Sequence, residues 1–61
     1  MEKFVEKFLK IYPSVPESLR GEIIAVVNGK TYSWNAVYFE VKNNTELSKK
    51  LLKSLISTKI L

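Results

Sequence analysis

The chain has 61 residues, of which 46% are hydrophobic and 26% are charged, a composition that predicts one small folded domain over residues 1–61 rather than a disordered segment. It has no cysteine, which excludes disulfide bonds and cysteine-ligated zinc. No apolar run approaches the roughly 18 residues of a membrane span, and regularly spaced glutamates near the start argue against a secretory signal peptide. We therefore expect a cytoplasmic protein with no membrane partner.

Histidine, aspartate and glutamine are also absent, while lysine and glutamate are abundant. This balance is typical of thermophilic proteins, although the four asparagines point the other way. A chain this short without crosslinks often depends on regular helices or on self-association. The composition therefore leaves a homodimer open.

Residues 2–12 are predicted to form an amphipathic helix that Pro13 ends, because the residue before a proline is pushed away from helical angles. The apolar stripe of this helix comprises Phe4, Val5, Phe8, Leu9, Ile11 and Tyr12. The opposite face carries Lys3, Lys7 and Lys10. One short helical turn should follow over residues 14–21, since Ser14 and Glu17 have the spacing of a capping box.

A β-hairpin is predicted at about residues 22–33, because Asn28-Gly29 between two β-rich runs favours a two-residue type I′ turn. This register pairs Val27 with Lys30, Ala25 with Tyr32, and Ile23 with Trp34. One face would then carry Ile23, Ala25, Val27, Tyr32 and Trp34. The other would carry Ile24, Val26, Thr31 and Ser33. Both faces of the first strand are apolar, so we expect something to cover each of them, at least in part.

Two structures compete for residues 34–42. A helix capped by Ser33 is favoured, because it avoids a long unpaired strand edge and gives an apolar stripe of Trp34, Val37, Tyr38 and Val41. Phe39 lies off that stripe. The alternative is a third strand over residues 37–42, with a bend at Asn35-Ala36.

A final helix should run to about Lys59, capped by Asn43, Asn44 or Thr45, with Asn43 and Glu46 at capping-box spacing. Its apolar stripe comprises Leu47, Leu51, Leu52, Leu55 and Ile56. Ile60 and Leu61 should tuck against the body or against a partner. The predicted fold class is α+β: an N-terminal helix, a short helical turn, a β-hairpin and two helices packed on the sheet.

The side-chain inventory argues against an enzyme. Without histidine or cysteine, the usual acid–base and thiol chemistry is missing, and the six glutamates are scattered along the chain. Two glycines are too few for a phosphate-binding loop. We predict no catalytic, cofactor-binding or metal site, and no small-molecule substrate.

The net charge of +4 and the pI near 9.5 are the features that favour an external partner, namely a polyanion. The candidate contact residues are Lys3, Lys7, Lys10, Lys49, Lys50 and Lys53. With nine lysines and one arginine, such contact should be weak and independent of sequence. The competing interpretation is that both lysine faces are simply solvated.

The rings of Tyr32, Trp34 and Tyr38 admit two interpretations: a platform for stacking nucleic-acid bases, or part of the core. We favour the core, because a chain this small needs its large side chains there. The resulting hypothesis is a small non-catalytic binding module that acts through protein–protein contact or self-association. The alternative is weak nucleic-acid binding through the lysine faces.

Overall fold

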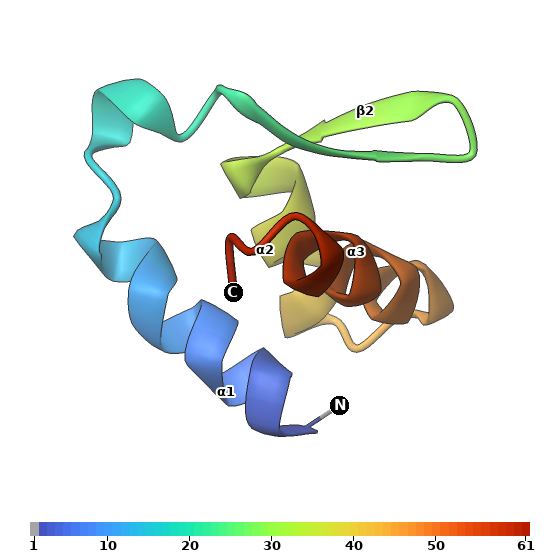
Figure 1. Ribbon diagram of the computed structural model, residues 1–61. Coiled ribbons are helices and arrows are strands. Elements are labelled where there is room, and N and C mark those ends of the chain that lie inside the picture. Colours follow the sequence, from blue (N-terminus) through green and yellow to red (C-terminus); the bar gives the residue numbers. More distant parts are fainter. Residues whose placement is uncertain (1) are drawn as a thin grey trace.

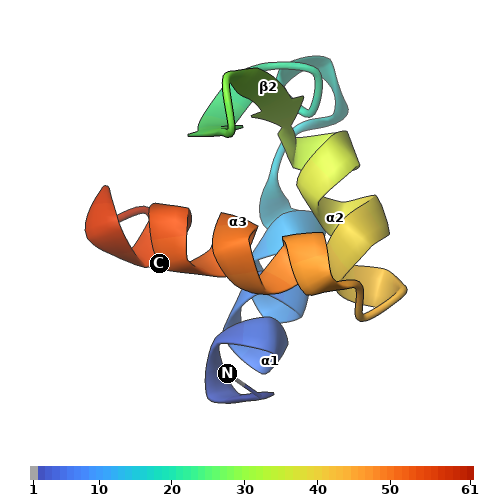
Figure 2. The same ribbon diagram turned by 90° about the vertical axis from the view of Figure 1, so that its right-hand side faces the viewer.

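The computed structural model describes residues 2–61 and confirms the α+β fold (Figure 1). The elements run in the order α1 (Glu2–Ile11), the 3₁₀ turns η1 (Tyr12–Ser14) and η2 (Glu17–Leu19), β1 (Ile23–Val27), β2 (Lys30–Ser33), α2 (Trp34–Lys42) and α3 (Glu46–Ser57). Residues 34–42 are therefore helical, not a third strand. The hairpin lies above α3 in both views, and α1 lies at the far end of the molecule from it (Figures 1 and 2).

The segment after α1 forms two separate 3₁₀ turns rather than one helical turn. The predicted capping box at Ser14 is wrong, because Pro16 precedes η2 and no side chain caps it. Ser14 instead ends η1, and its hydroxyl donates to the carbonyl of Ile11 at 2.6 Å. The two prolines divide the segment into short turns, each too short to build a capped helix.

The hairpin turn at Asn28-Gly29 is confirmed. Both residues have positive φ, 53° and 77°, as a type I′ turn requires. Pairing begins as predicted, with Val27 opposite Lys30 and Ala25 opposite Tyr32. The predicted Ile23–Trp34 pair is wrong, because the register shifts between Ile23 and Ala25 and Ile23 pairs with Ser33.

A β-bulge at Ile24 accounts for this shift. An extra residue in β1 sends the side chains of Ile24 and Ala25 to the same inner face, where both pack into the core. The outer face therefore carries Ile23 and Val26, which are 54% and 59% exposed. The predicted grouping of Ile23 with Ala25 on one face, and of Ile24 with Val26 on the other, is therefore wrong. Within residues 2–61 the outer face remains uncovered, contrary to the expectation that both faces would be covered.

Side chains cap both C-terminal helices. Ser33 caps α2 as predicted, accepting a hydrogen bond from the N–H of Ala36 at 3.2 Å. Thr45 caps α3 by accepting from the N–H of Ser48 at 3.1 Å. The predicted Asn43–Glu46 capping box is wrong, because Asn43 ends α2 by donating from its side-chain amide to the carbonyl of Phe39.

Left-handed residues follow both helices: Asn44 after α2 and Lys59 after α3, with φ of 51° and 64°. In each case the next N–H reaches back to the helix, from Thr45 to the Glu40 carbonyl and from Ile60 to the Leu55 carbonyl. The final helix therefore ends at Ser57, slightly before the expected end at about Lys59.

The core lies between the hairpin and the helices. Its buried apolar residues are Phe8, Ala25, Val37, Val41, Leu51, Leu52 and Leu55. Tyr32, Trp34 and Leu61 are partly buried and pack against this cluster, which confirms the core role of the two rings. Phe39, off the predicted stripe, points outward and is 62% exposed.

Candidate interaction surfaces

A column of aromatic and cationic groups joins α1 to α2. The Tyr12 and Tyr38 rings stack with centres 4.1 Å apart and planes inclined by 11°. Arg20 Cζ lies 4.6 Å from the centre of the Tyr12 ring, and Lys42 Nζ lies 5.9 Å from that of Tyr38. Trp34 in turn lies 5.9 Å from the ring of Phe8. These rings bind one another, which argues against their use as a platform for nucleic-acid bases.

Arg20, the single arginine of the chain, is committed to contacts within the molecule. Its Nε donates to the carbonyl of Val15 at 3.1 Å, and an Nη donates to that of Pro13 at 3.4 Å. The guanidinium also covers Tyr12. This arginine therefore fastens the segment between α1 and β1, and it is poorly placed to bind a phosphate.

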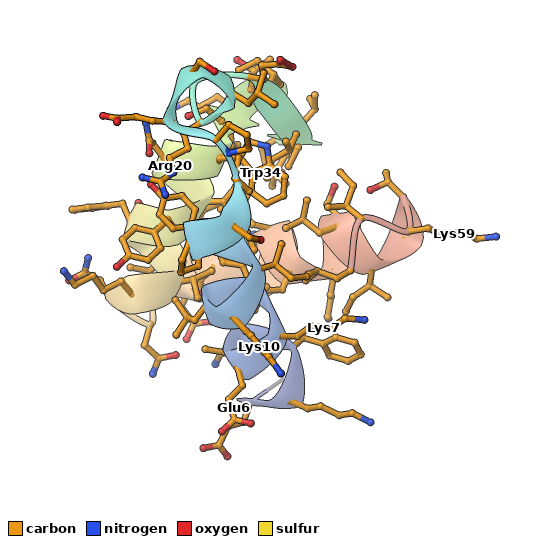
Figure 3. All side chains as sticks on the ribbon, turned by 90° about the vertical axis from the view of Figure 1, so that its left-hand side faces the viewer. Glu6, Lys7, Lys10, Arg20, Trp34 and Lys59 are labelled. Atoms are coloured by element: carbon orange, nitrogen blue, oxygen red, sulfur yellow. The ribbon has the colours of Figure 1, made fainter. Side chains whose placement is uncertain are left out.

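The six candidate lysines are all exposed, three on α1 and three on α3. Figure 3 shows Lys7 and Lys10 projecting from α1, with Glu6 on the same helix. On α3, Lys49 Nζ lies 3.6 Å from the carboxylate of Glu46, and both side chains are solvated. Each group of lysines thus lies on the outward side of its own helix, interspersed with glutamates.

Acidic side chains do not gather at any place in the part of the chain that the structure describes. No group of three or more potential metal ligands is found among residues 2–61. The carboxylate of Glu40 accepts a hydrogen bond from the hydroxyl of Thr45 at 2.6 Å, and this contact stabilises the corner between α2 and α3. The same residues contain no helix with the length and apolar character needed to cross a membrane.

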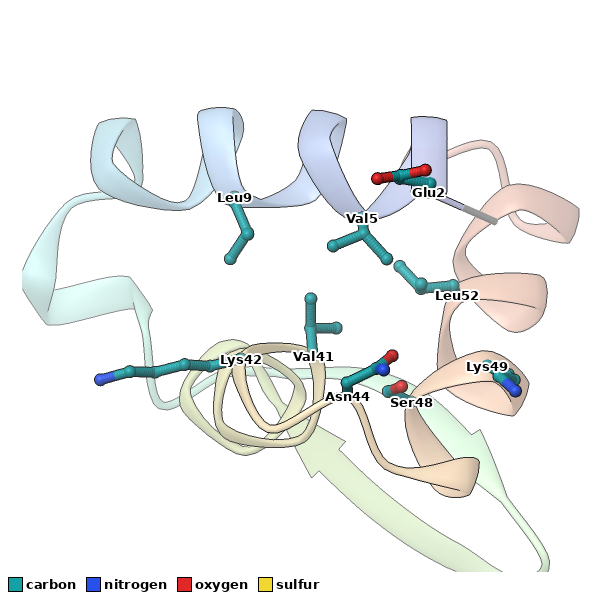
Figure 4. A pocket seen from close by; sticks show the side chains of 9 residues that line it. All are labelled: Glu2, Val5, Leu9, Val41, Lys42, Asn44, Ser48, Lys49 and Leu52. Carbon is teal, nitrogen blue, oxygen red and sulfur yellow. The ribbon is translucent and has the colours of Figure 1, made fainter.

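A groove of about 460 Å³ opens between α1 and the α2–α3 corner (Figure 4). Its apolar lining consists of Val5, Leu9, Val41 and Leu52. Its polar lining consists of Glu2, Lys42, Asn44, Ser48 and Lys49. The Ser48 hydroxyl is buried and donates to the carbonyl of Thr45, so it is not a free nucleophile. The groove can accommodate an aliphatic group, and its rim carries charges of both signs.

Sequence reasoning missed this groove because three helices build it from residues far apart in the chain. Leu9 was assigned to the helix stripe, and its side chain is indeed at the edge of the packed region, just over a third exposed. Periodicity identifies an apolar face, but it does not say which part of that face a neighbouring helix leaves open.

The hairpin presents a different surface, uncharged and only partly polar. Its outer face consists of Ile23, Val26, Thr31 and Ser33. The sheet described within residues 2–61 has only two strands, so the outer edge of β1 has no strand beside it. Helix α3 covers the inner face and continues past the β1 side of the hairpin (Figure 2). An uncharged face beside an open strand edge is a surface to which another chain can bind.

Comparisons of this chain with models of known protein families, with curated proteins and with solved structures found no match.

Proposed function

We propose that this protein is a small non-catalytic binding module that acts through protein–protein contact, with the hairpin as its contact surface. The observation that supports this proposal is the outer face of β1, where Ile23 and Val26 are more than half exposed beside an open strand edge. Apolar side chains exposed side by side on a strand without charges favour association with another polypeptide.

The expected affinity is moderate. Burying a whole aliphatic side chain contributes about 1.5 to 3 kcal/mol, so a half-exposed side chain such as Val26 has about 1 kcal/mol left to gain. Each backbone hydrogen bond to an added strand contributes about 0.5 to 1.5 kcal/mol. Association also costs translational and side-chain freedom, and the surface is small. We therefore expect a reversible complex with a Kd on the order of micromolar or weaker.

Site-specific photo-crosslinking tests this proposal in cells that express the chain. A benzophenone amino acid at Thr31 sits on the outer face while Ile23 and Val26 stay intact, because Thr31 is exposed and lies opposite Val26. The matched control carries the same amino acid at Glu6, which is exposed on α1 away from the hairpin (Figure 3). We expect discrete protein adducts from position 31 and none of the same mass from position 6. No adduct, or the same adducts from both positions, would contradict the proposal.

A second candidate function is weak, sequence-independent polyanion binding, which the exposure of all six candidate lysines favours. Fluorescence anisotropy with a DNA duplex and an RNA should then detect binding at low salt that is lost at moderate salt. Replacing Lys49, Lys50 and Lys53 with glutamine should reduce the salt dependence by up to about three counterions, if all three contact phosphates. The matched variant replaces Lys3, Lys7 and Lys10. Absence of binding at low salt would eliminate this function.

Two further expectations accompany the proposal as predictions. A cytoplasmic location is to be checked by cell fractionation. A thermophilic character is to be checked by the melting temperature of the purified chain, which should then lie well above about 65 °C.

A further inference from the structure

We propose that the polypeptide bound at the hairpin is a second copy of this chain. The β1 strands of two copies pair antiparallel about a two-fold axis at Val26 and form a four-stranded sheet in the order β2-β1-β1-β2. This inference deepens the proposed function and rests on it, since it names the partner of the same surface.

The register of the hairpin determines which groups are available for this pairing. In a two-residue type I′ hairpin the pair next to the turn, Val27 and Lys30, exchanges hydrogen bonds across the hairpin. The next pair, Val26 and Thr31, therefore directs its N–H and C=O groups outward. Among the backbone hydrogen bonds that residues 2–61 form outside the helices and the hairpin ladder, none involves Val26. In the pair of copies, the two Val26 residues satisfy each other's N–H and C=O groups.

The side chains fit this arrangement. With Val26 opposite Val26, each Ala25 faces the Val27 of the other copy, and both residues belong to the inner face. The inner face of the added strand then lies over the end of α3 that extends past β1 (Figure 2). The two Val26 side chains meet on the outer face, where each is otherwise 59% exposed.

Charge favours the antiparallel arrangement of two identical strands. β1 has no charged residue, so two copies with a net charge of +4 can meet there without placing lysines in contact. Glu22 precedes β1, and Lys30 follows the turn at its other end. Antiparallel pairing places the Glu22 end of each strand beside the Lys30 end of the other, whereas parallel pairing would place like charges together.

The bulge limits the length of the pairing, and the two-fold symmetry limits the pairing through β1 to two copies. At Ile24 the β1 backbone departs from regular register, so an added strand can pair only with residues 25–27. A two-fold pair uses the open edge of both β1 strands, which closes the assembly instead of extending it into a fibre.

Sedimentation equilibrium from about 1 µM to about 1 mM tests this inference with matched variants of one residue. Val26→Pro removes the outward N–H and keeps the hydrogen bonds between β1 and β2. Val26→Lys keeps the backbone intact and places a charge at the two-fold axis, so it provides the test if the proline variant does not fold. Val26→Thr preserves shape and strand propensity and is the control.

The wild-type chain and Val26→Thr should form dimers, and the other two variants should have dimer dissociation constants raised at least about tenfold, with unchanged far-UV circular dichroism. Isotope-filtered nuclear Overhauser effects between the Val26 residues of labelled and unlabelled copies should confirm the axis. A dimer that Val26→Pro and Val26→Lys leave unchanged overturns the inference. A strict monomer also overturns the inference. If the amino acid at position 31 then crosslinks a different protein, the proposed function stands. If it crosslinks nothing, the inference and the proposed function both fail.

Discussion

Phe8→Ala is expected to lower the free energy of unfolding by about 3 to 5 kcal/mol, a large part of the stability of this chain. A domain of this size has a total stability of only about 3 to 9 kcal/mol. Phe8 is fully buried, and its ring lies 5.9 Å from Trp34 and 6.2 Å from Tyr12. Truncation therefore opens a cavity where α1 meets the rest of the core. Urea denaturation followed by circular dichroism measures the loss.

Phe39→Ala is the matched control, because it removes the same atoms from a side chain that is 62% exposed. Its effect on the free energy of unfolding should stay below about 1 kcal/mol. Equal losses from Phe8→Ala and Phe39→Ala would contradict the assignment of Phe8 to the core.

Arg20→Ala should lower the free energy of unfolding by about 1 to 3 kcal/mol. The guanidinium donates to the carbonyls of Val15 and Pro13 and covers the Tyr12 ring. Its removal takes a hydrogen-bond donor away from each of these two carbonyls and exposes one face of the Tyr12 ring. The reduced stability is measured by thermal denaturation.

Arg20→Lys tests whether geometry or charge is responsible. Lysine retains the positive charge but lacks the planar fork that donates to two carbonyls while lying flat on a ring. We expect Arg20→Lys to recover less than half of the stability lost in Arg20→Ala. Full recovery with lysine would show that charge alone matters and that the two hydrogen bonds contribute little.

The strongest sequence signals were local and correct. Asn28-Gly29 has the two residue types that adopt positive φ with least strain, so the turn and the first pairs of the hairpin followed from chemistry within a few residues. The helix over residues 34–42 followed from a different consideration, the cost of a long strand edge left unpaired. Ser33 then both ends β2 and caps α2.

Register beyond the bulge was not predictable from pattern alone. Ile23 and Ile24 are chemically identical, so the sequence cannot say which one the sheet turns inward. The structure turns Ile24 inward, and this single shift changes the composition of the outer face. The candidate contact surface therefore includes Ile23, which sequence analysis had placed on the same face as Ala25 and Trp34.

Capping was also only partly predictable. Three consecutive residues, Asn43, Asn44 and Thr45, can each cap a helix, and the spacing to Glu46 favoured the first. The corner between α2 and α3 instead requires one left-handed residue, and asparagine accepts that conformation better than threonine. Asn44 occupies it, which leaves Thr45 as the cap of α3.

The stack of Tyr12 on Tyr38 affects the order in which parts of the molecule unfold locally. Helix α1 is joined to the hairpin by the short 3₁₀ segment, and the side chains of Val5 and Phe8, with Tyr12 of η1, hold it against residues much later in the chain. The amide protons of α1 should therefore exchange with solvent through local undocking, before those of β1 and α3 open. In that undocked form, the side of Trp34 that faces Phe8 is exposed to solvent. Indole fluorescence therefore detects the undocking of α1 separately from global unfolding.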